Sequence, residues 1–273
     1  MIVSPPVWTD AARANAFAHW LATVAPQHAL QPATVRLASV DASFRRYFRV
    51  DTTTGHSCII MDAPPALENC APFVKISALM HEAGLRVPQV LAWNQMQGFM
   101  LLTDLGMQTM LDVIAPPSTI ETLAAPTPAQ FDLYIDAVDL LVRLQLSSKP
   151  GVLPLYDDAL LSRELALFPQ WYVGQHRGFV PDVGLTGKLA PLFAQIKANN
   201  LNALGGARVF VHRDFMPRNL MVSASGELGI LDFQDAVYGP ISYDIASLMR
   251  DAFLSWEEEV VLDITVRYWQ KAR

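Results

Sequence analysis

The sequence predicts an α+β protein of two lobes, in which a small antiparallel sheet lobe precedes a mainly helical lobe. Most segments rich in strand-forming residues lie before residue 103, and helical periodicity dominates after it. The chain has 273 residues, of which 52% are apolar and 17% charged, so it can bury one large core or two smaller ones. We therefore predict an N-terminal lobe over residues 1–102 and a C-terminal lobe over residues 103–273.

The N-terminal lobe is predicted to open with a helix and to continue as an antiparallel meander. Thr9 or Asp10 can cap a helix whose apolar residues recur at helical spacing as far as Val24. Segments rich in β-branched and aromatic residues, separated by turn signals, then predict strands over 35–40, 47–50, 57–61, 90–93 and 99–102. A helix is predicted between the third and fourth of these strands, over 72–81, and Gly84 ends it.

The C-terminal lobe is predicted to be mostly helical. Apolar residues at helical spacing, separated by Pro-rich or polar text, predict helices over 131–146, 162–172, 189–201 and 256–268. Two short apolar runs, 209–211 and 229–231, predict buried strands on either side of a loop. The chemistry of the protein is expected in that loop.

Composition excludes several classes of protein. The formal charge of −6 argues against a broad basic face for nucleic acid. No apolar run approaches the length of a membrane span. The first residues carry no Lys or Arg, unlike a secretory signal, and Cys58 and Cys70 have no metal-like spacing. We therefore expect a cytoplasmic protein with two free thiols, although one disulfide is the alternative for a secreted chain.

The loop after residue 211 carries the pattern that phosphoryl transfer requires. Asp214 follows His212-Arg213, Asn219 comes five residues later, and Asp232 comes after a short hairpin. One carboxylate has to orient the attacking hydroxyl, and two further oxygen donors have to hold Mg²⁺ against nucleotide phosphates. The spacing matches the catalytic loop His-Arg-Asp-x-x-x-x-Asn. We predict Asp214 as the catalytic residue and Asn219 and Asp232 as metal ligands.

The alternative is that these are ordinary loop residues, since Asp and Asn are common in loops. The three fixed positions and the apolar strands on both sides argue against it. His212 is expected to hold the loop from within the core rather than to contact a substrate.

The chain resembles the aminoglycoside phosphotransferase and choline kinase-like family, which has a protein kinase-like fold. Within that family it is similar to the bacterial N-acetylmuramate/N-acetylglucosamine anomeric sugar kinases of cell-wall recycling. The resemblance covers the chain from about Val35 to its end, and it is carried by the segments 41–49, 61–65, 102–106 and 243–251. It implies ATP and Mg²⁺ as cofactors and a small-molecule substrate whose hydroxyl is phosphorylated.

The resemblance also implies a nucleotide site. The loop over residues 41–47 takes the place of the phosphate-covering loop but lacks its glycines. Ser43 can offer a hydroxyl, and Arg45 and Arg46 can offer guanidinium groups to phosphate oxygens, although a solvated Arg pair on a hairpin is the alternative. Thr103 and Leu105 are the hinge candidates for contact with adenine.

The third predicted strand departs from the family pattern. Protein kinases and most aminoglycoside kinases place a Lys there for the α- and β-phosphates, whereas residues 57–62 contain no Lys. Either Arg46 or Arg49 of the second strand supplies the cation, or the protein is a nucleotide-binding pseudokinase without turnover. The intact Asp214, Asn219 and Asp232 favour the first explanation.

The acceptor site is expected in the helical lobe. Asp235, Arg250 and Glu164 can bind hydroxyls or a carboxylate, Trp171 can stack on a sugar ring, and Arg163 is a second choice for a carboxylate. Each of them has an ordinary alternative as a cap, a surface ion pair or a core residue. An aminoglycoside, choline or homoserine is the alternative class of acceptor.

The end of the sequence raises a further expectation. Members of the resembled family usually continue past the segment that here ends at 269–273. We expect the helical lobe either to be a minimal version or to be truncated, and in the second case apolar residues would form an exposed patch or a dimer contact.

Overall fold

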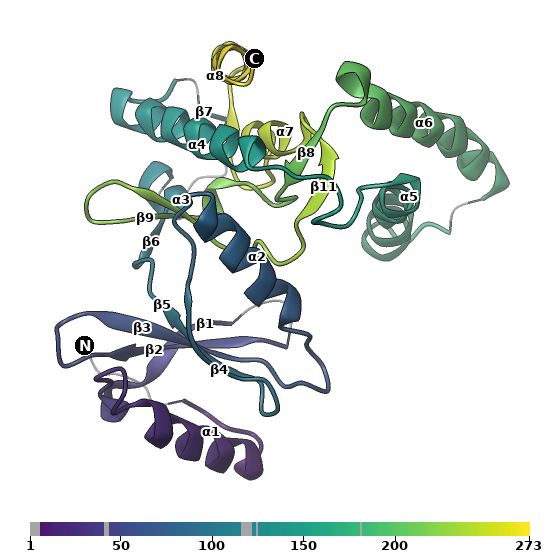
Figure 1. The fold of residues 1–273 in the computed structure, drawn as a ribbon. Helices are drawn as coiled ribbons and strands as arrows, with labels where there is room; N and C mark the ends of the chain where they lie inside the picture. Colours follow the sequence, from purple (N-terminus) through teal and green to yellow (C-terminus); the bar gives the residue numbers. More distant parts are fainter. Residues whose placement is uncertain (1–5, 41–43, 116–121, 124, 181) are drawn as a thin grey trace. The chain divides into compact units, whose positions relative to one another are not determined.

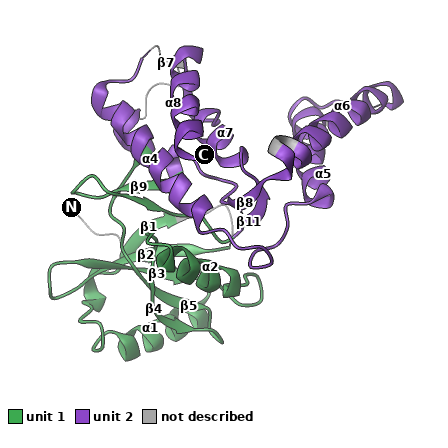
Figure 2. Ribbon diagram, turned by 45° about the horizontal axis from the view of Figure 1, so that its top comes forward, with its two compact units in different colours: residues 1–110, 219–234 green, residues 111–218, 235–273 purple. Residues whose placement is uncertain are grey.

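The computed structural model describes the chain except for residues 1–5, 41–43, 116–121, 124 and 181 (Figure 1). It divides into two compact units (Figure 2). Unit 1 comprises Met1–Met110 and Asn219–Gln234, and unit 2 comprises Leu111–Arg218 and Asp235–Arg273. The α+β class, with a sheet-based part and a largely helical part, is as predicted, whereas the boundary between residues 102 and 103 stays a prediction.

Unit 1 is built on a five-stranded sheet with the order β1-β2-β3-β5-β4. Its strands are β1 (Arg36–Val40), β2 (Arg46–Asp51), β3 (Ser57–Asp62), β4 (Val90–Asn94) and β5 (Phe99–Thr103). All neighbours are antiparallel, with Arg49 opposite Ile59 and Cys58 opposite Thr103. These strands match the predicted meander within one or two residues.

One face of this sheet is covered by α1 (Ala11–Val24). Asp10 caps the helix, because its Oδ1 accepts hydrogen bonds from Ala12 N at 2.8 Å and from Arg13 N at 3.3 Å. The helix buries Phe17, Trp20, Leu21 and Val24 in one cluster with Phe48, Val50, Ile60 and Phe99 of the strands. Alternation along β2 therefore assigns Phe48 and Val50 to the α1 face and Tyr47 and Arg49 to the opposite face.

The returning segment, Asn219–Gln234, completes unit 1. Its hairpin consists of β9 (Leu220–Val222) and β10 (Leu228–Ile230), and β9 also pairs with β6 (Gln108–Thr109). Phe233 packs against Phe73 of α2 (Ala71–Glu82), with ring centroids 4.9 Å apart. A Cβ at Gly229 would lie 2.9 Å from Arg86 Nη1 and Leu105 Cδ1 and 3.2 Å from Arg86 O, so a side chain there would require these neighbours to shift.

Unit 2 contains a packed layer of helices beside a two-stranded sheet. Its elements are α4 (Pro128–Leu146), α7 (Tyr243–Met249), α8 (Glu258–Lys271), β8 (Arg208–Val211) and β11 (Val237–Pro240), with the short pieces α3 (Met110–Ile114), β7 (Thr122–Leu123) and β12 (Ser255–Trp256). A capping box between Thr127 and Gln130 starts α4 three residues before the prediction. Trp256 Nε1 donates to Tyr134 Oη at 2.8 Å inside this layer.

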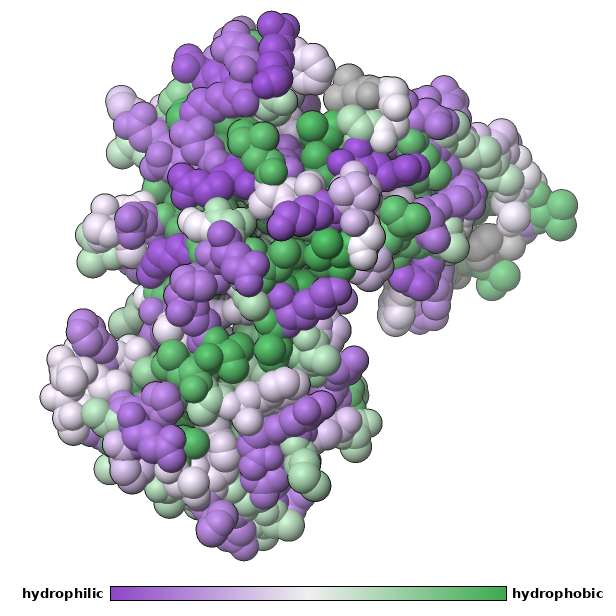
Figure 3. Space-filling model, viewed as in Figure 1, coloured by the Kyte–Doolittle hydropathy of each residue, from purple (hydrophilic) through white to green (hydrophobic). Residues whose placement is uncertain are grey.

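A second helical segment of unit 2 is much less packed. It consists of α5 (Asp158–Leu167), a π-helix (Phe168–His176) and α6 (Val183–Asn202), which passes through Pro191. Neither the π-helix nor α6 has a buried residue among those described. Apolar surface is visible at the outer end of α6 in Figure 3. The helix predicted over 162–172 instead divides into α5 and the π-helix.

Short 3₁₀ turns cover Pro32–Thr34, Ala203–Gly206 and Pro217–Asn219. In the part of the chain that the structure describes, no helix is both long enough and apolar enough to cross a bilayer.

Candidate active site

The predicted catalytic loop follows β8 and is anchored to a buried carboxylate. Asp244 of α7 is fully buried and accepts hydrogen bonds from His212 N at 2.7 Å and from Arg213 N at 3.0 Å. Asp214 N in turn donates to His212 Nδ1 at 3.3 Å, and the His212 ring is fully buried beside Phe215. The backbone of residues 212–214 is therefore fixed from the core side, and Asp214 is half-buried at its end.

The environment of Asp244 raises its pKa. Burial raises the pKa to about 7, although the two backbone N–H groups lower it and the charge of Asp214 raises it further. The loop that carries Asp214 therefore depends on an acid whose ionisation falls near neutral pH.

Arg213 has an unusual backbone conformation and a fixed side chain. Its φ is 81°, in the left-handed region that a non-glycine residue rarely adopts. Arg213 Nη2 donates to Glu164 Oε1 at 2.6 Å, while Nε is buried without a hydrogen-bond partner among the described residues. Such strain is commonly held at functional sites by the surrounding packing.

Glu164 of α5 uses both carboxylate oxygens within unit 2. Oε1 accepts from Arg213, and Oε2 accepts from Tyr156 Oη and, at 3.5 Å, from Tyr243 Oη. Burial and the neighbouring Glu164 raise the pKa of Tyr156. The structure therefore gives Glu164 partners in the loop after β8 (Arg213), just before α5 (Tyr156) and in α7 (Tyr243), and its predicted contact with substrate stays a prediction.

The two predicted metal ligands lie at the same end of one hairpin in unit 1. Asn219 directly precedes β9, and Asp232 follows β10 by two residues. The pairing of Leu220 with Ile230 continues through a hydrogen bond of 2.9 Å from Leu231 N to Asn219 O. Asp232 is exposed, has a φ of 63°, and accepts from Gln234 Nε2 at 2.7 Å.

This donor set suits Mg²⁺, which is commonly bound by one or two protein oxygens together with phosphates and water. Within the described residues there is no cluster of three or more His, Cys, Asp or Glu side chains that would bind a metal without a substrate. Asn219 and Asp232 belong to unit 1, and Asp214 belongs to unit 2.

The three predicted phosphate-binding arginines have different partners. Arg46 Nη2 pairs with Asp62 Oδ2 at 2.5 Å, and its guanidinium lies over Trp8. Arg49 Nε pairs with Asp104 Oδ2 at 2.5 Å. Arg45 Nε pairs with Glu68 Oε2 at 3.1 Å. Ser43 lies outside the described residues.

The predicted hinge begins at the last residue of β5. Thr103 N bonds to Gln89 O at 3.0 Å, and Leu105 is buried, with its carbonyl accepting from Arg86 Nη2 at 2.7 Å. A polar pocket of about 580 Å³ lies beside this segment in unit 1 and includes Ser57, Asp104 and Gly106. Burial alone would raise the pKa of Asp104, but hydrogen bonds from Arg49, Ser57 and Gly106 N lower it overall.

The remaining predicted acceptor residues are exposed. Asp235 is exposed directly after the returning segment, and Arg250 pairs with Glu258 at the surface. Trp171 is 58% exposed on the π-helix. Exposed side chains of this kind are available to a ligand, and their roles in acceptor binding stay predictions.

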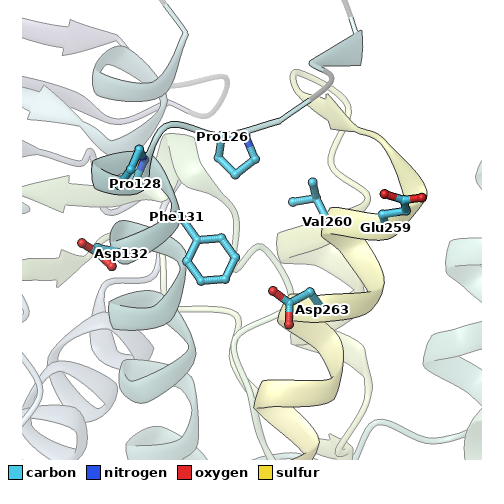
Figure 4. A pocket seen from close by; sticks show the side chains of 7 residues that line it. All are labelled: Pro126, Pro128, Phe131, Asp132, Glu259, Val260 and Asp263. Carbon is cyan, nitrogen blue, oxygen red and sulfur yellow. The ribbon is translucent and has the colours of Figure 1, made fainter.

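A separate pocket of about 430 Å³ lies between the first turns of α4 and α8 (Figure 4). Its lining is apolar at Phe131, Val260 and two prolines, with Asp132, Glu259 and Asp263 around it. None of these residues belongs to the predicted site.

Sequence reasoning missed three carboxylates that position the predicted groups. Glu68 holds Arg45, Asp62 holds Arg46, and Asp244 holds the catalytic loop. No local pattern distinguishes Glu68 from other acids, whereas Asp62 is the acid that directly follows the apolar run of residues 58–61.

The fold and the motif define a phosphotransferase with a kinase-like fold. The chain is similar in structure to a macrolide 2′-phosphotransferase from Brachybacterium faecium, with a TM-score of 0.62 and 14% identity over 93% of this chain and 82% of that one. The model of the phosphotransferase enzyme family matches residues 34–273, and the chain belongs to that family.

Two curated relatives are more similar in sequence. The chain is 47% identical to an N-acetylmuramate/N-acetylglucosamine kinase of Pseudomonas aeruginosa, over 88% of this chain and 67% of the relative. It is 46% identical to a kinase of the same name from Pseudomonas putida, over 86% of this chain and 65% of the relative. The chain therefore spans about two thirds of the length of these relatives.

Proposed function

We propose that this protein is an ATP- and Mg²⁺-dependent kinase that phosphorylates the anomeric hydroxyl of N-acetylmuramate or N-acetylglucosamine. The observation that carries the reaction type is the fixed backbone of residues 212–214, which presents Asp214 at the end of a loop anchored by buried Asp244. The names and the 46–47% identity of the two Pseudomonas relatives support the choice of acceptor.

Asp214 is proposed to accept a hydrogen bond from the acceptor hydroxyl and to take its proton as the hydroxyl oxygen bonds to the γ-phosphorus, while the bond from that phosphorus to the β–γ bridging oxygen breaks and ADP leaves. Its loop is held by Asp244 and by the Glu164–Arg213 pair, so the carboxylate needs little reorganisation when the substrate binds. Phosphoryl transfer asks mostly for positioning and electrostatic stabilisation, which a fixed carboxylate provides.

Asn219 and Asp232 are proposed to hold Mg²⁺. Both present side-chain oxygens at one end of the β9–β10 hairpin, and the register of the hairpin fixes their spacing. When bound, Mg²⁺ would neutralise charge on the β- and γ-phosphates of ATP. The strained φ of Asp232 fits a residue whose orientation matters more than its local conformational energy.

The remaining predicted roles belong to the same proposal. Ser43 is proposed to contact phosphate, and Thr103 and Leu105 to contact adenine. Asp235, Arg250, Glu164 and Trp171 are proposed around the acceptor, where carboxylates accept sugar hydroxyls and an aromatic face covers the ring. We place the reaction in the cytoplasm, where ATP is abundant and where buried unpaired thiols such as Cys58 and Cys70 persist.

The missing lysine of the third strand supports a second candidate function. β3 (Ser57–Asp62) contains no Lys, and a nucleotide-binding protein without turnover would tolerate that loss. A kinase of another metabolite, such as an aminoglycoside, choline or homoserine, is the other alternative.

The test is an incubation of the full chain with γ-labelled ATP and Mg²⁺ against a panel of acceptors. The panel contains N-acetylmuramate, N-acetylglucosamine, an aminoglycoside, choline and homoserine, and mass spectrometry identifies the product. We expect a sugar phosphate from the two amino sugars. Transfer only to another member of the panel would refute the proposed acceptor, and ATP binding without any transfer would favour the pseudokinase.

Two variants test the proposed roles. Asp214→Asn should lower turnover by about 10³-fold or more while leaving ATP affinity within about twofold. Asp232→Ala should remove the Mg²⁺ dependence of ATP binding. Wild-type dependence on Mg²⁺ in Asp232→Ala would contradict the metal assignment.

A further inference from the structure

The proposed function requires a cation for the nucleotide phosphates, and β3 supplies none. Position by position, β3 offers Ser, Cys, Ile, Ile, Met and Asp. The arginines of the neighbouring strand, Arg46 and Arg49, and Arg45 just before it are the nearest cations in the sequence. Their partners and the faces of the sheet on which they lie distinguish the three.

Arg46 lies on the face that α1 covers. It shares that face with Phe48 and Val50, its guanidinium lies over Trp8 and Phe48, and both Nε and Nη2 donate to Asp62 Oδ2. Asp62 also takes Arg13 of α1 through Oδ1, at 2.6 Å. Arg46 therefore joins α1 to the sheet, and it points away from the face that carries Tyr47 and Arg49.

Arg49 lies on that opposite face but is fixed at the hinge end of the strand. Its Nε and Nη2 donate to the two oxygens of Asp104, and Nη2 also donates to Gly106 O at 2.7 Å. Ser57 Oγ donates to the same Asp104 carboxylate at 2.6 Å. Arg49 therefore holds residues 104–106 to the sheet.

Arg45 directly precedes β2, beside the loop that joins β1 and β2. Its side chain forms a hydrogen bond with that of Tyr47, which the alternation along β2 places on the face opposite α1. Glu68 accepts from Arg45 Nε at 3.1 Å through Oε2 and from Phe44 N at 3.1 Å through Oε1. The Glu68 carboxylate thus binds both the backbone and the guanidinium at the end of the loop. The side chains of Arg45 and Glu68 are only 13% and 11% exposed.

We propose that Arg45 takes the place of the missing strand lysine as the phosphate-binding cation, and that Glu68 is the residue that positions it. This inference rests on the proposed function, because it assumes that ATP is the ligand. The pair joins the loop to the entrance of α2, since Glu68 lies three residues before Ala71. In protein kinases, a Glu within the corresponding helix forms an ion pair with the strand lysine and positions it. Glu68, just before the helix, has the same role toward Arg45 in this proposal.

The chemistry of the pair fits this assignment. A guanidinium offers two donor edges, and Glu68 engages the Nε edge, so the plane of the group is set before a phosphate binds. Burial by itself lowers the pKa of Arg45, but Tyr47 and Glu68 raise it overall, so the group stays charged. A charged, oriented guanidinium binds phosphate oxygens through two parallel hydrogen bonds, which a lysine cannot form.

The test measures binding of ATP and of adenosine to the full chain by calorimetry in the presence of Mg²⁺. Arg45→Ala should weaken ATP binding by about 10- to 100-fold, the equivalent of one or two charge-assisted hydrogen bonds, and change adenosine binding by less than about twofold. Glu68→Gln should weaken ATP binding by about 3- to 10-fold, because the guanidinium is retained but loses its orientation. In the Arg45→Ala background, Glu68→Gln should have no further effect on ATP.

Two matched controls remove the same groups elsewhere in unit 1. Glu82→Gln neutralises an exposed Glu at the far end of α2, and Arg36→Ala removes an Arg of β1 that pairs with Asp51. Both should leave ATP and adenosine affinities unchanged within about twofold. If Arg45→Ala does not fold by circular dichroism, Arg45→Lys replaces it, with an expected loss of about 3- to 10-fold for ATP alone.

Three outcomes overturn the inference. The first is wild-type ATP affinity in a folded Arg45 variant. The second is an equal loss for ATP and adenosine, which would indicate a role in loop structure rather than in phosphate binding. The third is a loss from Glu68→Gln that persists in the Arg45→Ala background. A wild-type chain that binds no ATP would refute the proposed function itself, and this result is visible before any variant is made.

Discussion

Each unit contains a cluster built on arginine–carboxylate ion pairs, and the two clusters differ in what they hold in place. The Asp62 cluster consists of Asp62, Arg13 and Arg46 in unit 1. The Glu164 cluster consists of Glu164, Arg213, Tyr156 and Tyr243 in unit 2. Asp62 is fully buried, whereas Glu164 is 21% exposed.

The difference lies in what each arginine is attached to. Arg13 belongs to α1 and Arg46 belongs to β2, so the Asp62 cluster connects a helix to a strand. Arg13 Nη1 also donates a hydrogen bond to Gln97 O at 2.5 Å. Arg213 belongs to a loop with a strained backbone, next to Asp214. The Glu164 cluster therefore fixes a segment that lies outside the β-strands. The comparison indicates that the first cluster mainly serves stability and the second mainly serves the geometry of the loop that carries Asp214.

The largest expected effect is the loss of Asp62. Asp62→Asn removes the charge that compensates two arginines, and we expect it to lower the free energy of unfolding by about 3 kcal/mol. Urea unfolding followed by circular dichroism measures this. Asp51→Asn is the control, because its pair with Arg36 is 28% and 40% exposed and should contribute less than about 1 kcal/mol. Equal effects of the two variants would remove the distinction between a buried and a surface pair.

The pH dependence of stability tests the anchoring of the predicted catalytic loop, residues 212–214, next to the Glu164 cluster. The pKa of Asp244 rises from 3.8 to about 7 on folding, so the folded state holds this proton over a range where the unfolded state has lost it. Asp244 therefore favours folding most at low pH, and its contribution falls as pH rises from about 4 to 7, by at most about 1.4 kcal/mol per pH unit. Asp244→Asn should remove this slope. The same slope in wild type and variant, measured between pH 5 and 7, would contradict the assignment.

A smaller effect, on turnover, is expected from the Glu164 cluster itself. Glu164→Gln keeps the shape of the side chain but removes the charge facing Arg213. We expect kcat to fall by about tenfold with the KM for ATP unchanged, and the free energy of unfolding to change by less than about 1.5 kcal/mol. Steady-state kinetics with denaturant unfolding separates the two effects. A loss confined to stability would make the two clusters equivalent, and a rise in acceptor KM alone would support the sequence prediction that Glu164 contacts the substrate.

The smallest effect is expected at Arg250. Its pair with Glu258 is 54% and 61% exposed, unlike the pairs of either cluster. Arg250→Gln should change the free energy of unfolding by less than about 1 kcal/mol. The acceptor KM of the same variant tests the other prediction for this residue. An increase of about tenfold would support a contact with the acceptor, and an unchanged KM would leave only a surface ion pair.

The regular elements of unit 1 were predictable because their signals are local. Segments rich in strand-forming residues and separated by a turn signal within residues 35–61 predict β1, β2 and β3, and a cap at Thr9 or Asp10 followed by apolar residues at helical spacing predicts α1. The spacing of Asp214, Asn219 and Asp232 equally predicts a hairpin between the last two, which is β9–β10. These features depend on neighbouring residues in the sequence.

Features that depend on distant partners were not predictable. β8 pairs with β11, not with the strand predicted at 229–231, because the hairpin returns to unit 1. The partner of Arg45, Glu68, is 23 residues away, and no local pattern selects it over other acids. The helix at 183–202 passes through Pro191, where the sequence suggested that a helix begins near 189.

The return of Asn219–Gln234 to unit 1 has a consequence for synthesis of the protein. Residues 1–110 leave the ribosome with β6 still unpaired, because its partner β9 is more than a hundred residues further along the chain. At typical translation rates of about 5 to 20 residues per second, that strand waits for several seconds or longer. The nascent chain must keep this edge from aggregating during the interval, and the two proposed metal ligands arrive on the segment that ends it.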